Sequence, residues 1–381
     1  MEILRPETPD ALAEALASAA REGKRIRTGG AFTKDAFAGP LAAADVCVSS
    51  AALNRVLQYE PRDLTVSVQA GLPYAELCRV LAENGQMLPL DPPLGESATI
   101  GGVVAANHSG PRRRLYGTAR DMVIGMTFAT LEGKLVQAGG MVVKNVAGLD
   151  VAKLMIGSCG TLGMLVSINF RVHPRPPATR TFLLDFETAE QAIGARDRIL
   201  RSVLQPAAVD LLNPAAAARL GRAGFVLAVQ AGGSSAVLDR YASELENSVP
   251  LEAEPEAEFW RAVREFAPDH LARTPRCAVA RVATTLAGVR EVMEQATAPA
   301  LARAAAGVAY VAFDSGADAA EWVRQAAARG WKAVLEWAAP EEKAALLQWP
   351  APGNDLELMQ AVKNLFDPAH LLNKGRLYGR I

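Results

Sequence analysis

The chain has 381 residues, which is long for one domain and comfortable for two. Hydrophobic residues make up 50% of it and charged residues 21%, so the chain can bury a core and is not disordered. With 40 basic and 41 acidic residues the formal net charge is −1, which gives no indication of a nucleic-acid partner.

The start of the chain and its hydropathy predict a cytoplasmic protein. No basic start followed by an apolar run marks a signal peptide, and no apolar stretch approaches the roughly 20 residues that span a bilayer. We expect contact with the inner face of the plasma membrane only through a partner. The cysteines and histidines are too scattered to predict a disulfide framework, an iron–sulfur cluster or a metal site: Cys47, Cys78, Cys159, Cys277, His108, His173, His270 and His370.

The first part of the chain predicts alternating helices and short strands. Thr8 caps a helix that ends at Gly23. The elements expected after it are strands 25–27 and 46–48, a hairpin of 55–60 and 64–68, and a helix 73–84. Residues 86–117 are rich in Pro and Gly and poor in periodic segments, so we expect loop there. Beyond it we expect strands 123–131, 135–138 and 164–172, with a helix near 150–156.

Residues 174–177, Pro-Arg-Pro-Pro, predict a linker. The strand–helix units and Ala-rich helices that follow indicate a second α+β domain. Thr188 and Gln191 form a capping box for one of its helices. The strands expected there are 209–212, 225–231, 277–282 and 308–313, and a last helix covers 356–366; no fixed-period repeat is evident.

Two glycine-rich segments suggest a site for a phosphorylated, flat ligand. A diphosphate needs several backbone N–H donors that converge on one spot. The segment Arg27–Thr33 can supply them, because a strand ends there and small residues bend the chain. Taken alone, that segment is better explained as a plain turn after a strand. The second segment, residues 98–110, offers a wall of small residues against which a tricyclic ring can lie. A purely structural loop of that length with so few apolar anchors is unusual.

These segments resemble the FAD-binding domain of the vanillyl-alcohol-oxidase, or PCMH-type, family. The family's T-I-G-G matches Thr99–Gly102, and its G-S-E-G-T-L-G is similar to residues 157–163, with Cys159 in place of the acidic residue. Its L-N-P-G-R-L is similar to residues 372–377, with Lys374 replacing proline, and Ser109-Gly110 stands where two glycines are usual.

The resemblance implies an α+β fold in three parts. A two-subdomain FAD-binding domain would cover residues 1–175, a smaller ferredoxin-like α+β cap domain residues 178–350, and a C-terminal segment that returns to the FAD domain residues 351–381.

The resemblance also implies residue roles. The diphosphate would be held by Arg27, Thr28, Gly29, Gly30, Ala31, Phe32 and Thr33. The flavin and its ribityl chain would be lined by Thr99, Ile100, Gly101, Gly102, Asn107, Ser109 and Gly110, with Pro89, Tyr116 and Gly117 completing the pattern. The adenosine half would lie near Gly157, Gly160 and Gly163, and Asn373 would return toward the isoalloxazine. Ala31 occupies the place where some relatives attach FAD to a histidine, so FAD would bind non-covalently.

Within the family the chain is similar to FAD-binding E subunits of bacterial glycolate oxidases, because residues 143–150 resemble their V-x-K-N-V-A-G-Y-D, with Leu149 for the tyrosine. This implies a complex in which a D-type FAD subunit takes hydride from glycolate and an F-type iron–sulfur subunit carries electrons to quinone. The H-x-G-D-G-N-x-H metal segment of D-type subunits does not occur here.

Two alternatives stay open at this point: a stand-alone oxidase or dehydrogenase of a hydroxy acid or alditol, and a non-catalytic assembly subunit. Neither a catalytic base nor a cation for a substrate carboxylate can be named from the sequence.

The remaining candidates have plain structural interpretations. The run Arg112-Arg113-Arg114 could grip a phosphate or a partner, although solvated arginines on a loop are commoner. We expect His108 to contact FAD through its backbone, His270 to be a surface or satisfied histidine in a loop, and Cys159 to be a small packed residue. The tryptophans all lie in the second half of the chain, where core packing explains most of them.

Overall fold

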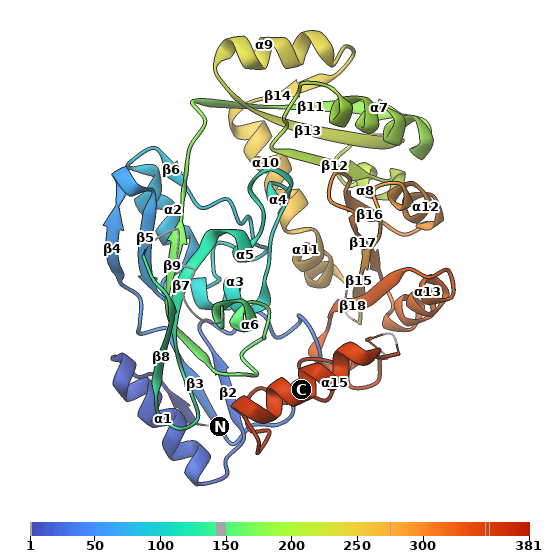
Figure 1. The fold of residues 1–381 in the computed structure, drawn as a ribbon. Helices are drawn as coiled ribbons and strands as arrows, with labels where there is room; N and C mark the ends of the chain where they lie inside the picture. The colour runs from blue at the N-terminus through green and yellow to red at the C-terminus, as the bar shows by residue number, and fades with distance from the viewer. Residues whose placement is uncertain (1, 142–149, 275, 347, 350) are drawn as a thin grey trace. The chain divides into compact units, whose positions relative to one another are not determined.

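The computed structural model describes residues 2–141, 150–274, 276–346, 348–349 and 351–381. The chain divides into two compact units (Figure 1). The first contains Met1–His108, Thr118–Arg175 and Ala351–Ile381, and the second contains Ser109–Gly117 and Pro176–Pro350. The sequence predicted one unbroken first domain over residues 1–175, whereas Ser109–Gly117 belongs to the second unit. That segment belongs to the second unit because Arg114 donates a hydrogen bond of 2.8 Å to the carbonyl of Pro206.

The first unit begins with a small parallel sheet in the order β1-β3-β2, formed by Glu2–Leu4, Val46–Ser49 and Ile26–Gly29. Helix α1 (Pro9–Arg21) buries Leu12 and Leu16 in the same core as Val46 and Val48. The predicted N-cap is confirmed, since the Thr8 hydroxyl accepts a bond of 3.2 Å from the N–H of Ala11. All four residues of β3 are buried, as expected for the middle strand of a parallel sheet.

A five-stranded antiparallel sheet follows, in the order β4-β5-β9-β7-β8. Its strands are Val56–Glu60, Thr65–Gln69, Met164–Arg171, Val123–Ala129 and Leu135–Gly139. The predicted hairpin is confirmed: β4 and β5 pair around the short 3-10 turn η1 (Pro61–Asp63). Helix α2 (Tyr74–Ala82) leads to β6 (Gln86–Met87), which pairs with β10 (His173–Pro174).

The stretch expected to be loop contains three short helices: α3 (Ile100–Ala106), α4 (Arg113–Tyr116) and α5 (Ala119–Met122). Helix α3 forms because the Thr99 hydroxyl caps it, accepting from the N–H of Gly102 at 3.3 Å. The N–H of Gly101 also bonds the carbonyl of Ala70 at 2.7 Å, and a Cβ on Gly101 would lie 2.9 Å from the Cβ of Ala70. The glycines therefore let helix α3 lie against the end of β5. The helix is too short for a helical periodicity of apolar residues to be visible in the sequence. Helix α6 (Ala152–Met155) is likewise shorter than the predicted 150–156.

The second unit is built on an eight-stranded antiparallel sheet in the order β14-β11-β13-β12-β16-β17-β15-β18. Its strands are Ala178–Phe186 (β11), Ala208–Leu212 (β12), Phe225–Gly233 (β13), Val249–Leu251 (β14), Ala278–Ala283 (β15), Ala300–Arg303 (β16), Val308–Phe313 (β17) and Lys332–Ala338 (β18). Its helices are α7 (Ala189–Arg201), α8 (Pro214–Ala218), α9 (Ser235–Glu244), α10 (Ala253–Arg264), α11 (Phe266–Arg273), α12 (Gly288–Gln295), α13 (Gly316–Ala328) and α14 (Pro340–Lys343). The predicted capping box of Thr188 and Gln191 is confirmed at α7.

This sheet consists of two copies of one topology. The first repeat runs β11-α7-β12-β13-α9-β14, with α8 inserted after β12, and the second runs β15-α12-β16-β17-α13-β18. Each is a strand–helix–strand–strand–helix–strand unit of ferredoxin-like type. The two meet where β12 pairs with β16. The repeat is one of topology, which explains why the sequence shows no fixed period.

Helix α15 (Asn354–Phe366) begins the C-terminal part of the first unit. After it the chain runs beside β2: the N–H of Ile26 donates to the carbonyl of Leu371 at 2.8 Å, and the N–H of Asn373 donates to the carbonyl of Ile26 at 3.0 Å. Residues far apart in sequence therefore meet at the end of β2. None of the helices among the described residues has the length and apolar character that crossing a bilayer requires.

Candidate functional site

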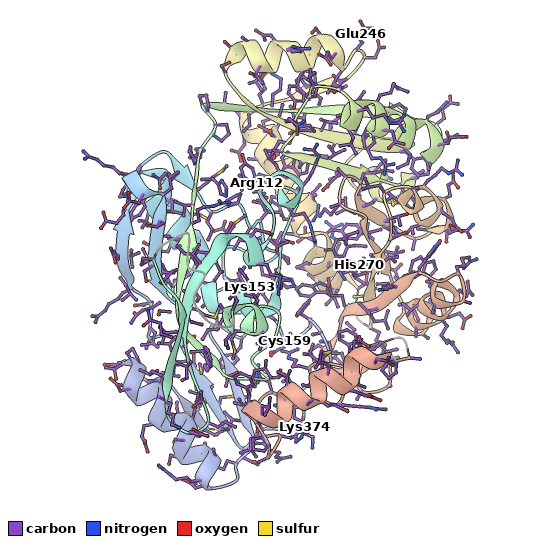
Figure 2. All side chains as sticks on the ribbon, in the orientation of Figure 1. Arg112, Lys153, Cys159, Glu246, His270 and Lys374 are labelled. Atoms are coloured by element: carbon purple, nitrogen blue, oxygen red, sulfur yellow. The ribbon has the colours of Figure 1, made fainter. Side chains whose placement is uncertain are left out.

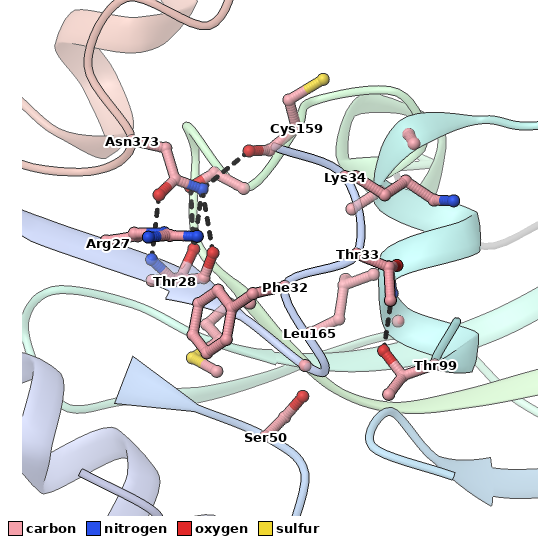
Figure 3. A pocket seen from close by; sticks show the side chains of 18 of the residues that line it. Arg27, Thr28, Phe32, Thr33, Lys34, Ser50, Thr99, Cys159, Leu165 and Asn373 are labelled. Atoms are coloured by element: carbon pink, nitrogen blue, oxygen red, sulfur yellow. Dashed lines mark hydrogen bonds between the residues drawn. The ribbon is translucent and has the colours of Figure 1, made fainter. Parts of the chain in front are cut away.

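A pocket in the first unit opens at the end of β2 (Figure 3). The empty space inside it, open solvent included, is about 780 Å³. Four segments line it: the loop after β2, helix α3, the loop before β9, and the C-terminal tail. Most of the lining residues are small, so backbone forms much of the wall.

The pocket brings together many of the residues named from the sequence. Those that line it are Arg27, Thr28, Gly29, Gly30, Ala31, Phe32, Thr33, Thr99, Gly101, Gly102, Gly160, Gly163 and Asn373.

Other residues named from the sequence lie elsewhere. Pro89, Ile100, Asn107 and Gly157 are not among the lining residues, and the Ile100 side chain is fully buried in the core. Ser109, Gly110, Tyr116 and Gly117 belong to the second unit. The segment 143–149 with Lys144 lies outside the described residues.

Sequence reasoning missed several lining residues: Lys34, Asp35, Phe37, Leu41, Ser50, Ala105, Ala106, Cys159, Met164, Leu165 and Arg376. Cys159, expected to be a packed residue, has a φ of 52° and lies on the pocket wall. Because Cys159 lies inside the glycine motif of residues 157–163, the sequence offered a signal that it borders the pocket.

The loop after β2 is held in a fixed shape. A Cβ on Gly30 would lie 2.1 Å from the Thr99 hydroxyl oxygen, so only glycine fits there. Ser49 donates to the Gly30 carbonyl at 2.8 Å. Arg27 binds both carboxylate oxygens of Asp35 at 2.6 Å and covers the ring of Phe32, whose centroid lies 4.6 Å from its Cζ. The loop is therefore preorganised by contacts on both of its sides.

This loop offers unused backbone donors. Across the described residues, no hydrogen bond occupies the N–H groups of Gly30, Ala31, Phe32 and Thr33. Phe32 has a φ of 53°, in the left-handed region, which turns the chain sharply between these donors. Successive N–H groups in such a turn form a concave site for anions such as a diphosphate.

Asn373 joins the two loops that form one end of the pocket (Figure 3). Its side-chain oxygen accepts from the N–H of Thr28 at 2.9 Å, and its amide nitrogen donates to the Thr28 hydroxyl at 3.0 Å and to the Cys159 carbonyl at 2.8 Å. A Cβ on Gly160 would lie 2.6 Å from that amide nitrogen and 2.7 Å from the Thr28 hydroxyl oxygen. Close approach of these segments therefore needs glycine at position 160.

A buried ion pair fixes the segment that carries Asn373. The Lys363 ammonium donates to Asp367 at 2.5 Å, to the carbonyl of Thr161 at 2.7 Å and to the carbonyl of Leu372 at 3.1 Å. Burial lowers the pKa of Lys363, and Asp367 acts in the opposite direction. Asp367 in turn accepts from the N–H groups of Leu371 and Leu372. The pair thus ties the tail to the loop before β9.

Arg376 stabilises the far side of the first loop. Its guanidinium donates to the carbonyls of Phe37, Gly39 and Lys34, the last at 3.0 Å. The side chain is therefore used to hold backbone in place.

His108 and His270 are buried and are held by contacts with other parts of the chain. His108 is buried, and its ring meets Phe37 edge-on with centroids 4.3 Å apart. His270 lies on α11 and not in a loop (Figure 2). It is 1% exposed, with Nδ1 3.0 Å from Arg219 and Nε2 3.0 Å from the carbonyl of Phe313. The expectation of a satisfied histidine is confirmed for His270.

Comparisons with protein families identify the kind of domain that forms this pocket. Residues 2–139 match the model described as FAD binding domain, and residues 341–377 match the C-terminal domain of FAD linked oxidases. The glycolate oxidase subunit GlcE of Escherichia coli is 41% identical over 40% of this chain and 42% of its own length. Subunit GlcD of Bacillus subtilis is 32% identical over 42% of this chain and 34% of its own length.

The D-lactate dehydrogenase of Anaerostipes hadrus is 32% identical over 44% of this chain and 35% of its own length. The chain thus matches less than half the length of each of these relatives. Among solved structures, an alkyldihydroxyacetonephosphate synthase superposes with a TM-score of 0.73 at 17% identity, covering 97% of this chain and 76% of the other. That likeness shows the fold, an α+β PCMH-type FAD-binding architecture.

The chain carries an FAD binding domain and a match to the C-terminal domain of FAD linked oxidases, and FAD is its cofactor. The residues of the pocket fit that cofactor. Free backbone N–H groups after β2 suit the diphosphate, and the glycine-lined wall leaves room where a Cβ at Gly30 or Gly160 would intrude. FAD supplies the two-electron chemistry that no side chain offers.

Proposed function

We propose that this FAD-linked oxidoreductase is the FAD-binding subunit of a glycolate oxidase or dehydrogenase complex. Its flavin would take part in the oxidation of glycolate to glyoxylate, with electrons passing through a partner iron–sulfur subunit to quinone. A D-type FAD subunit would be its second partner. The likeness to the Escherichia coli subunit, at 41% identity, supports the choice of glycolate over other hydroxy acids.

The observation that carries this proposal is the set of free N–H groups from Gly30 to Thr33 beside a wall that tolerates only glycine. Arg27 and Thr28 are held by Asp35 and Asn373, so we assign them a positioning role at the diphosphate. With Ala31 in the loop, that position offers no side chain for a covalent bond to flavin, and we propose non-covalent binding.

The test is co-purification of the chain from its native cells, with flavin absorption and identification of the partners. We expect a yellow complex that contains a second flavoprotein and an iron–sulfur protein. Anaerobic mixing with glycolate should reduce flavin in the complex. A chain that reduces its own flavin without partners would favour a stand-alone oxidase, and a colourless chain would favour an assembly subunit.

Gly30→Ala tests the pocket itself. The added Cβ would collide with the Thr99 hydroxyl oxygen at 2.1 Å, so the loop must move and flavin content should fall at least tenfold. Gly140→Ala is the matched control, because a Cβ there has no neighbour within 4 Å among the residues that the structure describes. Circular dichroism of both variants separates loss of flavin from loss of folding. Full flavin content in Gly30→Ala would contradict the assignment of the loop.

A further inference from the structure

The C-terminal tail, residues 367–381, has little regular structure to hold it beside the pocket. Helix α15 ends at Phe366, and in the described range 351–381 one isolated bridge, between Leu372 and Ile26, joins the tail to a sheet. Two backbone hydrogen bonds with Ile26, of 2.8 and 3.0 Å, accompany that bridge. The tail nevertheless supplies Asn373 and Arg376 to the pocket wall. Side-chain contacts must therefore contribute to its placement.

Lys363 and Asp367 form the most buried of these contacts. They stand one turn apart at the end of α15, and their side chains are 1% and 0% exposed. The ammonium has three donors, and all three are used, on Asp367 and on the carbonyls of Thr161 and Leu372. The Asp367 carboxylate also accepts from the N–H groups of Leu371 and Leu372, at 3.0 and 2.8 Å. The pair is thus fully bonded and joins the tail to the loop before β9.

Stability alone does not account for this pair. Replacing a buried ion pair with packed apolar side chains is often neutral or stabilising, because burial takes two charges out of water. A fully bonded pair adds a fixed geometry, since each of its hydrogen bonds is directional. Every bond that Lys363 and Asp367 make beyond each other goes to backbone of the tail or of the loop before β9. The geometry that the pair fixes is therefore the position of the tail against that loop.

Arg376 anchors the tail a second time. Its guanidinium donates to the carbonyls of Phe37, Gly39 and Lys34. The N–H of Gly39 returns a hydrogen bond of 2.9 Å to the carbonyl of Arg376. A Cβ on Gly39 would lie 2.3 Å from the carbonyl oxygen of Gly375, so the two backbones are in close contact. The tail and the end of the loop after β2 are therefore packed as one piece.

The tail holds the diphosphate loop on both of its sides. Asn373 bonds Thr28 before the loop, and Arg376 bonds the carbonyl of Lys34 after it (Figure 3). Between these points lie residues 30–33, whose backbone N–H groups are unused in the described part of the chain. Such donors bind an anion well only while they are held converging on one spot. The tail thus fixes both ends of the segment that fits the diphosphate.

We propose that FAD binding and docking of the C-terminal tail stabilise each other, with Lys363 and Asp367 as the positioning pair that couples them. FAD needs the loop in one shape, and the docked tail holds that shape. By thermodynamic linkage, whatever FAD gains from the docked tail, the docked tail gains from FAD. The inference concerns the cofactor and goes beyond the proposed function, because it holds for any substrate of the flavin.

The first test is titration of the full-length apo chain with FAD, followed by flavin fluorescence. We expect Lys363→Met to weaken FAD binding about tenfold, a size typical of coupled sites. Lys363→Met/Asp367→Asn removes both charges, so it should recover the stability that Lys363→Met loses by leaving a buried carboxylate unpaired. Its FAD affinity should stay low, because the bonds to Thr161 and Leu372 are still missing.

Leu81→Ala is the matched control for general loss of stability. Leu81 is 0% exposed in α2 of the same unit and does not line the pocket. Its truncation leaves a cavity that lowers stability. Leu81→Ala should bind FAD as wild type does at any temperature where both are folded.

The second test is hydrogen exchange of the tail in the wild-type chain with and without FAD, which needs no variant to fold. We expect FAD to slow exchange at the N–H groups of Leu371, Leu372 and Asn373. Unchanged exchange there would overturn the proposal. Equal FAD affinity in wild type and Lys363→Met would overturn it too, as would full recovery of affinity in the double variant. Both tests are run without glycolate or partner subunits, so their failure is distinct from a failure of the proposed function.

Discussion

The two repeats of the eight-stranded sheet share a topology but use one face in different ways. In the first repeat that face carries apolar residues such as Leu183, Ala208 and Val226, which pack with Phe259 and Trp260 of α10. In the second repeat the same face carries a polar row of Arg281, Tyr310 and Glu336, in which Arg281 stands opposite Tyr310 and pairs with Glu336. The same strand order therefore supports a packed core in one half and a charged surface in the other.

A cluster of polar side chains joins β11 of the first repeat to α10. Glu256 of α10 accepts from the hydroxyls of Thr179 and Thr181, both at 2.7 Å, and Trp260 donates to Thr181 at 2.7 Å. The second repeat leaves the Nε of Arg303 without a partner.

The largest effect is expected from Trp260→Ala. Trp260 is 3% exposed, so its removal leaves a cavity, and we expect the free energy of unfolding to fall by about 3–5 kcal/mol. Chemical denaturation followed by circular dichroism measures it.

Arg281→Met is the counterpart of Trp260→Ala in the second repeat. Because the Arg281 side chain is 30% exposed and paired with Glu336, we expect the free energy of unfolding to fall by about 1 kcal/mol or less, measured by the same denaturation. An equal fall in the free energy of unfolding for Trp260→Ala and Arg281→Met would contradict the difference between the two repeats.

The sequence predicts those elements of both units whose signals are local. The Thr8 cap, the β4–β5 hairpin and the Thr188 box each rest on a few adjacent residues, and all are confirmed. Helix α3 escaped prediction because it has seven residues and depends on contact with Ala70. The doubled topology of the second unit also escaped, since strand order is set by pairings between distant residues.

The residues around the pocket also divide into those with a local sequence signal and those without one. The glycine motifs predicted its wall, because glycine at those positions reflects a local steric requirement. Arg376 and Lys363 could not be assigned, since their roles depend on carbonyls distant in sequence, of Phe37 and Thr161. The polar row had no sequence signal beyond single charged residues in separate strands. Arg114, interpreted as solvated, instead binds the carbonyl of Pro206.

A smaller effect is expected from Thr188→Ala, which makes the first repeat resemble the second at its first helix. Thr188 caps α7 with a capping box, whereas the equivalent helix α12 begins after Ala287, which has no side-chain oxygen. Loss of the cap should reduce the free energy of unfolding by about 1 kcal/mol, measured by denaturation. Ser234→Ala is the control, because Ser234 precedes α9 without a side-chain cap bond. Equal losses in both variants would show that the Thr188 hydroxyl has no special role.

The smallest effect is a change in pH dependence at Glu336. Burial raises the pKa of this carboxyl, while Arg281, a hydrogen bond with Trp337 and Arg113 lower it, and Tyr310 also faces the group. Below the ordinary glutamate pKa of 4.5 the carboxyl is protonated in both the folded and the unfolded chain, so its burial carries no penalty. As pH rises through the raised pKa, the unfolded chain binds fewer protons than the folded one and stability falls. Glu336→Gln should therefore gain stability relative to wild type as pH rises from about 4.5.

Arg281→Met should show a steeper fall in stability with rising pH than wild type, because the cation that favours ionised Glu336 is gone. Parallel stability curves for all three proteins between pH 4 and pH 8 would show that Glu336 is not held in a desolvated setting, and the contrast between the repeats would then rest on the Arg303 donor alone.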